Sequence, residues 1–332
     1  MKTILFAALA FSLIATTAYA DGYGARLEGF DYPHPVQTFA LHTQGQDLEM
    51  AYMDIQPEKP NGRTAVLLHG KNFCAATWDA TIGALSAEGI RVIAIDQIGF
   101  CKSSKPAGYQ FSLSQLADNT RALLTKLGVQ RAVVMGHSMG GMLGMRFALA
   151  YPQMVDQLLL VNPIGLEDWQ AKGVPYAAID ALYAGELKTT AQSIRDYQLK
   201  FYYNGVWKPE YDRWVDMQAG LYAGAGRERV AYNQAQTSDM IFTQPVVHEF
   251  GSITVPTVLF IGLNDRTAPG SPRAPDALRA QLGDYPALGK SAAAAIPQST
   301  LVEFEGLGHS PQVEAPDVFH AALKKALAQV KQ

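Results

Sequence analysis

Short apolar runs separated by longer amphipathic stretches set the pattern of the chain from residue 64 onward. The apolar runs have the length and β-branched content of buried strands, at residues 64–68, 91–95, 131–135, 157–161, 255–261 and 300–304. Stretches with helical periodicity fall between the first of them, at residues 76–88, 112–127 and 139–151. This alternation predicts an α/β fold with a mostly parallel central sheet and helices on both faces. Ahead of it, segments 35–44 and 47–55 predict an antiparallel hairpin that turns at Gln44-Gly45-Gln46.

The alternation breaks after residue 162. Residues 163–250 contain no strand-like run, but they contain helical patterns, including 174–187, 189–203 and 208–223. This segment also holds Trp169, Trp207 and Trp214, three of the four tryptophans of the chain. We therefore expect an inserted helical cap at 163–250, on a core formed by 21–162 and 251–332. Most of its aromatic side chains should pack the cap onto the core, and a few should line a substrate pocket.

The first twenty residues have the form of a secretory signal peptide. Lys2 is followed by an apolar run from Ile4 to Ala15 and by the cleavage pattern Ala18-Tyr19-Ala20. An uncleaved anchor is the alternative, although the run is short for a membrane span. No later segment reaches eighteen consecutive apolar residues. We expect an exported protein, periplasmic or secreted, whose mature chain begins near Asp21 and has no integral membrane segment.

Composition narrows the classes of partner. A hydrophobic content of 48% allows a sizeable core, and the net charge of −3 without a basic cluster argues against nucleic acid. We expect a small-molecule partner, and neither a metal ion nor a cofactor.

The clearest chemical signal is Gly136-His137-Ser138-Met139-Gly140, which fits the pattern G-x-S-x-G. An apolar run precedes it and a small-residue helical stretch follows, so Ser138 falls on a tight strand-to-helix turn. Such a turn exposes a serine as a nucleophile, and its glycines allow neighbouring backbone to come close.

A nucleophilic serine needs a base, and the base needs an acid that orients it. Asp265 comes just after the predicted strand 255–261, and His309 lies in the loop after strand 300–304. The order Ser138, Asp265, His309 differs from the orders in chymotrypsin and subtilisin. Asp96 is the main competitor for the role of the acid, whereas Asn162 cannot serve as one.

These features together resemble the α/β-hydrolase superfamily, in its serine-nucleophile branch, over nearly the whole chain after residue 20. Three further motifs resemble that family, and they stand in its order: Val66-Leu-Leu-His69-Gly70, Asp96-Gln-Ile-Gly99 with Lys102 to Pro106, and Gly308-His309-Ser-Pro311 to Pro316. The resemblance implies the α/β-hydrolase fold. A serine at position 138 argues against the haloalkane dehalogenase and epoxide hydrolase branches, which have aspartate there.

The resemblance also implies roles for the residues around the nucleophile. The backbone amides of Met139 and Lys71 should form the oxyanion hole, with Asn72 as the alternative to Lys71. His137, Asn72, Trp169 and Trp207 are candidates for the substrate pocket.

The two cysteines, Cys74 and Cys101, are an even count in a chain with an export signal. In the fold that the resemblance implies, they follow neighbouring strands, which favours a disulfide at the rim of the site. Two separately buried thiols are the alternative.

The function that this pattern predicts is that of a serine hydrolase acting on a carboxylic ester through an acyl-enzyme. Relatives with the same triad hydrolyse carbon–carbon bonds or act as cofactor-free perhydrolases or haloperoxidases, so these activities remain alternatives. A ligand-binding protein without turnover is a further alternative from a different class.

Overall fold

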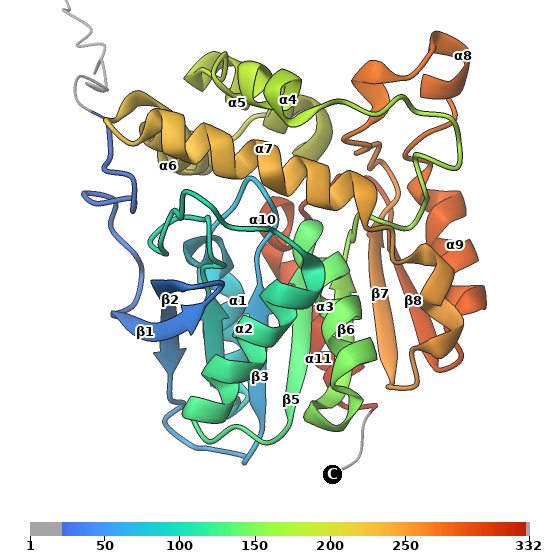
Figure 1. The fold of residues 1–332 in the computed structure, drawn as a ribbon. Helices are drawn as coiled ribbons and strands as arrows, with labels where there is room; N and C mark the ends of the chain where they lie inside the picture. Colours follow the sequence, from blue (N-terminus) through green and yellow to red (C-terminus); the bar gives the residue numbers. More distant parts are fainter. Residues whose placement is uncertain (1–21, 330–332) are drawn as a thin grey trace, which may run out of the picture.

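The computed structural model describes residues 22–329, so the predicted signal peptide at 1–20 lies outside the described residues. One eight-stranded sheet forms the centre of the molecule, with strand order β1-β2-β4-β3-β5-β6-β7-β8 (Figure 1). The strands are β1 Val36–Thr43, β2 Gln46–Ile55, β3 Thr64–Leu68, β4 Arg91–Ile95, β5 Ala132–His137, β6 Val155–Val161, β7 Thr257–Gly262 and β8 Ser299–Phe304. β2 pairs antiparallel with β1 and β4, and the other five pairs are parallel. The predicted α/β architecture is confirmed.

Helices cover both faces of the sheet. Successive residues of a strand point to opposite faces, and in β5 Val134 belongs to one apolar cluster while Val133 belongs to the other. The first cluster includes side chains of α2, α3 and α9, and the second includes side chains of α1 and α11 (Figure 1). These helices are α1 Asp79–Ala87, α2 Leu113–Lys126, α3 Met139–Ala150, α9 Tyr285–Ala295 and α11 Pro316–Leu327.

The insertion between β6 and β7 is helical, as the sequence predicts. Its helices lie over the carboxyl ends of the parallel strands (Figure 1). They are α4 Ile179–Glu186, α5 Ala191–Tyr197, α6 Asp212–Ala223 and α7 Arg227–Thr243, and a π-helical turn, η3 Gln198–Tyr202, continues α5. Within residues 22–329, no helix is long and apolar enough to cross a bilayer.

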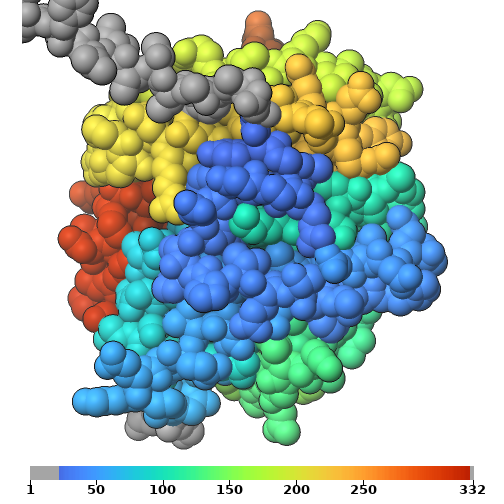
Figure 2. Space-filling model, turned by 90° about the vertical axis from the view of Figure 1, so that its left-hand side faces the viewer, coloured from blue at the N-terminus to red at the C-terminus, as the bar shows by residue number. Residues whose placement is uncertain are grey.

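The segment before β1 fastens the cap to the core. The amide of Tyr23 donates to the carbonyl of Gly220 in α6 at 2.8 Å, and the guanidinium of Arg213 donates to the carbonyl of Asp31 at 2.9 Å. Figure 2 shows this segment, in dark blue, between the yellow cap residues and the hairpin β1–β2. The first described residues of the chain therefore hold helix α6 of the cap in place.

The long connection after β7 also contacts the cap insertion. It contains the short helix α8 Asp276–Arg279 and then α9, which packs against β7 and β8. The amide of Gly283 donates to the buried carboxylate of Glu167 at 2.9 Å, and the hydroxyl of Tyr285 donates to the carbonyl of Pro163 at 3.2 Å. This connection thus braces the first residues of the insertion.

A disulfide joins the loops that follow β3 and β4, which confirms the prediction. The Cα atoms of Cys74 and Cys101 lie 5.9 Å apart, and both residues are buried. Cys101 has a φ of 46°, in the left-handed region that favours glycine. The bond fixes this backbone beside the loop that carries Lys71.

Removing the disulfide should lower the stability of the protein. The cysteines are 27 residues apart, and closing a loop of that length stabilises the folded state by roughly 3 kcal/mol in the chain-entropy treatment. For a chain of this size we expect the Tm of the Cys74→Ser/Cys101→Ser variant to fall by roughly 5 °C. Calorimetry of the oxidised protein and the variant measures the difference, and equal Tm values would contradict the expected contribution.

Candidate active site

The candidate site lies at the sheet edge where the parallel strands end. β3 and β5 are paired through Leu68 and Gly136, and β5 and β6 are paired through His137 and Val161. Their carboxyl ends therefore meet at one level, and ligands of such sheets bind just beyond this level. The polar residues that follow β5, β6, β7 and β8 there are Ser138, Asn162, Asp265 and His309.

Ser138 occupies a strained turn between β5 and α3. Its backbone has φ 55° and ψ −119°, a conformation that a residue with a side chain rarely adopts. The amide of Ser138 donates to the carbonyl of Val161 at 3.1 Å, and the carbonyl of Ser138 accepts from the amides of Gly141 and Ile164 at 2.9 and 3.2 Å. Hydrogen bonds on both sides thus maintain a conformation that costs about 1–3 kcal/mol.

The glycines of the motif are required by close packing of backbone. A Cβ atom on Gly140 would lie 2.1 Å from the carbonyl oxygen of Leu68, and one on Gly136 would lie 2.0 Å from that of Gly140. The start of α3 therefore approaches β3 more closely than any side chain allows. This explains the G-x-S-x-G pattern in physical terms.

His309 and Asp265 are hydrogen-bonded to each other in the interior. The distance from His309 Nδ1 to Asp265 Oδ2 is 2.6 Å, and both residues have no exposed surface. Because a carboxylate only accepts, Nδ1 carries the proton, and a neutral ring then has its lone pair on Nε2. Among residues 22–329, Nε2 has no hydrogen-bond partner. This is the tautomer that a general base requires.

Two further donors hold the Asp265 carboxylate. The amide of Thr267 donates to Oδ1 at 2.7 Å, and Asn162 Nδ2 donates to Oδ2 at 2.8 Å. The side-chain oxygen of Asn162 in turn accepts from the amide of Gly262 at 3.0 Å. Sequence reasoning considered Asn162 only as an acid and missed this role. The signal that could have found it is an amide side chain directly after the apolar run at 158–161 that ends β6.

Replacing Asn162 should weaken turnover without affecting substrate affinity. A hydrogen bond to a charged group is worth about 1.5–3 kcal/mol, so we expect Asn162→Ala to lower kcat roughly 10- to 100-fold and KM by little. Asn119→Ala is the matched control. Asn119 is also buried, but it lies in α2 and its side chain donates to the hydroxyl of Tyr109 in the loop before that helix. Steady-state kinetics of both variants decide, and equal kcat values in the two would contradict a role for Asn162 in orienting Asp265.

The cap and His137 enclose the His309 loop. The ring of Tyr202 lies 5.0 Å from the His309 ring and that of His137 lies 4.9 Å from it, and the amide of His309 donates to the carbonyl of Phe201 at 3.1 Å. Burial lowers the pKa of His137 well below its ordinary value. The neutral His137 ring donates from Nε2 to the His309 carbonyl at 2.8 Å. His137, at the end of β5, therefore contacts the loop from the side of the sheet, and η3 covers it from the side of the cap.

The loop after β3 passes directly beside Ser138. A Cβ atom on Gly70 would lie 3.0 Å from Cβ of Ser138, and the amide of Phe73 donates to the carbonyl of Gly70 at 3.1 Å. Lys71 and Asn72 are thus the two central residues of a β-turn, whose own amides take no part in its closing hydrogen bond. Met139, the other predicted oxyanion donor, is the first residue of α3, where amides lack intrahelical partners.

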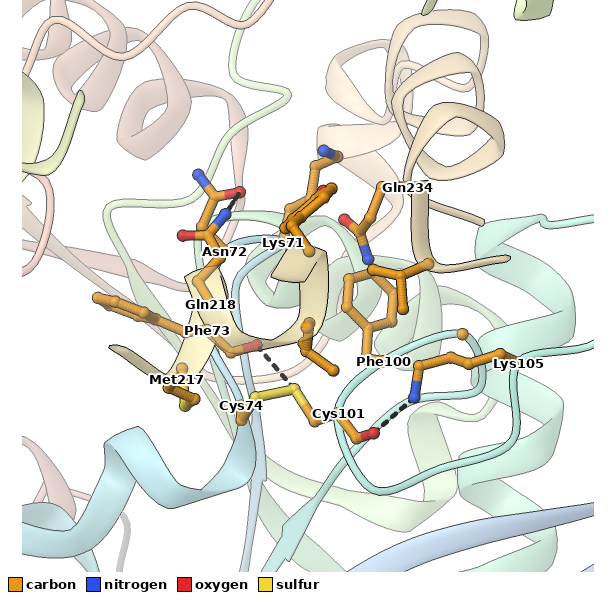
Figure 3. A pocket seen from close by; sticks show the side chains of 14 residues that line it. Lys71, Asn72, Phe73, Cys74, Phe100, Cys101, Lys105, Met217, Gln218 and Gln234 are labelled. Carbon is orange, nitrogen blue, oxygen red and sulfur yellow. Dashed lines mark hydrogen bonds between the residues drawn. A yellow bond between two sulfur atoms is a disulfide. The ribbon is translucent and has the colours of Figure 1, made fainter. Parts of the chain in front are cut away.

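A small cavity of ≈ 20 Å³ adjoins this turn (Figure 3). Its lining includes Asn72, Phe73, the disulfide, Met217, Gln218 and Gln234. Of the predicted pocket residues, Asn72 lines it, whereas Trp169, Trp207 and His137 do not. Trp169 is buried against Glu167, and Trp207 packs within the cap on Tyr203 and Tyr211.

The carboxylate of Asp96 is hydrogen-bonded to segments other than those that carry His309 and Asp265. Its carboxylate accepts from the amides of Ala75 and Lys102 at 2.8 and 3.1 Å and from the hydroxyl of Tyr32 at 2.7 Å. It therefore ties together the loops after β3 and β4. Within residues 22–329, Asp96, Cys74 and Cys101 are the one group of side chains close enough together to share a metal ion. The disulfide leaves the two cysteines without the thiolates that would bind a metal.

Comparisons with known proteins agree with the fold. The model of a family described as the alpha/beta hydrolase family matches residues 65–322. A probable hydrolytic enzyme from Pseudomonas aeruginosa PAO1 is 60% identical, with a TM-score of 0.92 over 93% of this chain and 99% of that one. An esterase from Thermogutta terrifontis, 21% identical, has the same fold, with a TM-score of 0.69 over 89% and 100% of the two chains.

Curated relatives are more distant. A putative carbamate hydrolase of Pantoea ananatis is 25% identical over 82% of this chain and 91% of its own length. An uncharacterized protein of Mycobacterium tuberculosis is 37% identical over 106 residues, so this chain spans only 30% of that protein. The family match, which extends from β3 to α11, and the similarity to the Pseudomonas enzyme over almost the whole chain lead to one conclusion: this protein belongs to the alpha/beta hydrolase family.

Proposed function

We propose that this protein is a serine hydrolase that cleaves a carboxylic ester through an acyl-enzyme on Ser138. The observation that carries the proposal is the buried hydrogen bond of 2.6 Å between His309 and Asp265, at the same sheet edge as Ser138 on its strained turn. Nucleophile, base and orienting acid are the three parts that acyl transfer through a serine requires.

Each group has a defined role in this mechanism. Nε2 of His309 takes the proton of the Ser138 hydroxyl as Oγ attacks the ester carbonyl, and the amides of Met139 and Lys71 stabilise the tetrahedral oxyanion. The imidazolium, stabilised by Asp265, then gives its proton to the leaving alkoxide. Water, activated by the same base, releases the acid and restores Ser138.

The surroundings favour a substrate without a negative charge. The ammonium of Lys71 is paired with Glu186 at 2.7 Å, so it is not free to bind an anionic substrate. An ester is the expected class, because alkoxide is a better leaving group than the nitrogen of an amide.

A substrate panel tests the proposal. It contains p-nitrophenyl esters with acyl chains of two to twelve carbons, matched anilides, a carbamate, a lactone and a ring-cleavage dienone, each with wild type and Ser138→Ala. We expect serine-dependent turnover of esters, and the series of acyl chains measures the chain-length preference. Turnover of the dienone or the carbamate alone would contradict ester hydrolysis. Turnover of none of these substrates would contradict the proposed serine hydrolase.

We also propose that the protein is exported. The signal-like residues 1–20 and the disulfide, which persists in oxidising compartments, support this. Fractionation of cells producing the full chain, followed by N-terminal sequencing, should find protein that begins near Asp21 outside the cytoplasm. Full-length protein retained in the cytoplasm would contradict export.

A further inference from the structure

A polar network links the loop after β3 to the cap. Lys71 Nζ lies 2.7 Å from Glu186 Oε1, with only 18% and 17% of the two side chains exposed. The hydroxyl of Tyr222, a buried residue of α6, donates to the other oxygen, Glu186 Oε2, at 2.6 Å. Both oxygens of the carboxylate are therefore engaged, and Lys71 is held in one position.

The second central residue of the same turn is also bound to the cap. Asn72 Nδ2 donates to the hydroxyl of Tyr202 at 3.1 Å, and its Oδ1 accepts from Gln218 Nε2 at 3.2 Å. Figure 3 shows Lys71 and Asn72 side by side above the disulfide, with Gln218 reaching Asn72. The turn is thus attached to α4, η3 and α6, which are three separate parts of the insertion.

The Lys71–Glu186 pair differs from other ion pairs of the cap. Arg195 and Asp212 also form a pair, but their side chains are 40% and 53% exposed, and such surface pairs contribute little. A largely buried pair contributes little net stability either, because desolvation offsets the attraction, yet it fixes geometry. The geometry that Lys71–Glu186 fixes is that of the turn beside Ser138.

We propose that Glu186 is a positioning residue for the reaction. By holding Lys71, it fixes the backbone amides of the turn as oxyanion donors, so the oxyanion hole is complete only while the cap is docked. This inference rests on the proposed serine hydrolase. It assigns to the Lys71 side chain a role as the anchor of its own backbone amide.

Kinetics of four variants test this role. Glu186→Gln and Lys71→Met each break the pair, and Lys71→Met/Glu186→Leu removes both charges so that neither remains buried alone. Arg195→Met removes the cation of the exposed pair and is the matched control. Each protein is assayed with a short-chain p-nitrophenyl ester and with a trifluoromethyl ketone, which forms a tetrahedral oxyanion on the nucleophile.

Losing an oxyanion donor lowers kcat roughly 100- to 1000-fold, so a displaced donor should cost roughly 10- to 100-fold. We expect that loss in kcat for the first three variants, with KM changed less than threefold. The Ki of the ketone should rise by the same factor as kcat falls, since both report the oxyanion. The double variant should be no slower than the slower single variant, and Arg195→Met should match wild type.

The double variant keeps the test valid if a single variant is unstable. A folded double variant with kcat and Ki within twofold of wild type would overturn the inference. A rise in KM with unchanged Ki would also overturn it, because Glu186 would then serve substrate binding. A wild type without ester turnover would overturn the proposed function and this inference together, whereas an active wild type with unaffected variants overturns the inference alone.

Discussion

Ser138→Ala is expected to lower kcat for ester hydrolysis by roughly 10⁶-fold, the size of effect found when the nucleophile of a serine triad is removed. Without Oγ no acyl-enzyme forms, and only binding and the oxyanion donors remain to assist attack by water. The effect should fall on kcat, with KM changed little. Stopped-flow and steady-state kinetics with a p-nitrophenyl ester measure it.

Ser310→Ala is the matched control for this loss. Ser310 is a fully buried serine adjacent to His309, and its hydroxyl has no partner among the described residues. We expect it to remain within about tenfold of wild type. If Ser310→Ala lost activity while Ser138→Ala kept more than a hundredth of it, the nucleophile would be assigned to the wrong serine.

Asp265→Asn is expected to lower kcat by roughly 10⁴-fold. The amide would keep the shape of the side chain, but its NH₂ group could face Nδ1 of His309, which would move the ring proton to Nε2. His309 would then be the wrong tautomer to accept the proton of Ser138, as in the serine-protease case. A kcat ratio measured at saturating substrate gives the size of the loss.

Asp96→Asn separates this effect from a general loss of structure. Asp96 is as buried as Asp265 but accepts from the loops after β3 and β4, so its replacement should lower Tm more than it lowers kcat. An Asp265→Asn variant with near-normal turnover, beside a folded and inactive Asp96→Asn variant, would show that the acid is Asp96.

The parts of the fold that the sequence predicts well are those set by local pattern. The predicted strands at 64–68 and 91–95 coincide with β3 and β4, because in each the four buried residues after the first are all apolar. Ser138, Asp265 and His309 come after the predicted strands that correspond to β5, β7 and β8. This predicts that all three lie at one sheet edge, because parallel strands end on the same side.

The cap was harder to divide into helices. The sequence predicts one helix over 189–203, whereas the structure has α5 at Ala191–Tyr197 followed by the π-helical turn η3. The predicted ranges also omit α7, because this helix buries the polar residues Asn233, Gln234 and Thr237 and so lacks a clean apolar stripe. Local periodicity does not reveal polar side chains whose partners come from other segments.

The contacts that orient the candidate site join residues distant in sequence. Asn162 and Asp265 are 103 residues apart, and Lys71 and Glu186 are 115 residues apart. Residue type and spacing predicted the chemistry that we propose. Which amide supports Asp265, and which carboxylate neutralises Lys71, depends on the packing of the cap and of the loops, which a single sequence does not specify.

Trapping of the acyl-enzyme tests the central claim most directly. The protein is mixed with a fluorophosphonate, digested, and mapped by tandem mass spectrometry, beside a sample quenched in acid during turnover of a slowly hydrolysed ester. We predict one phosphonyl adduct and one acyl adduct, both on the peptide that contains Ser138, and neither in Ser138→Ala. Active protein that carries the adduct on another residue, or turns over ester without any covalent adduct, would contradict the account.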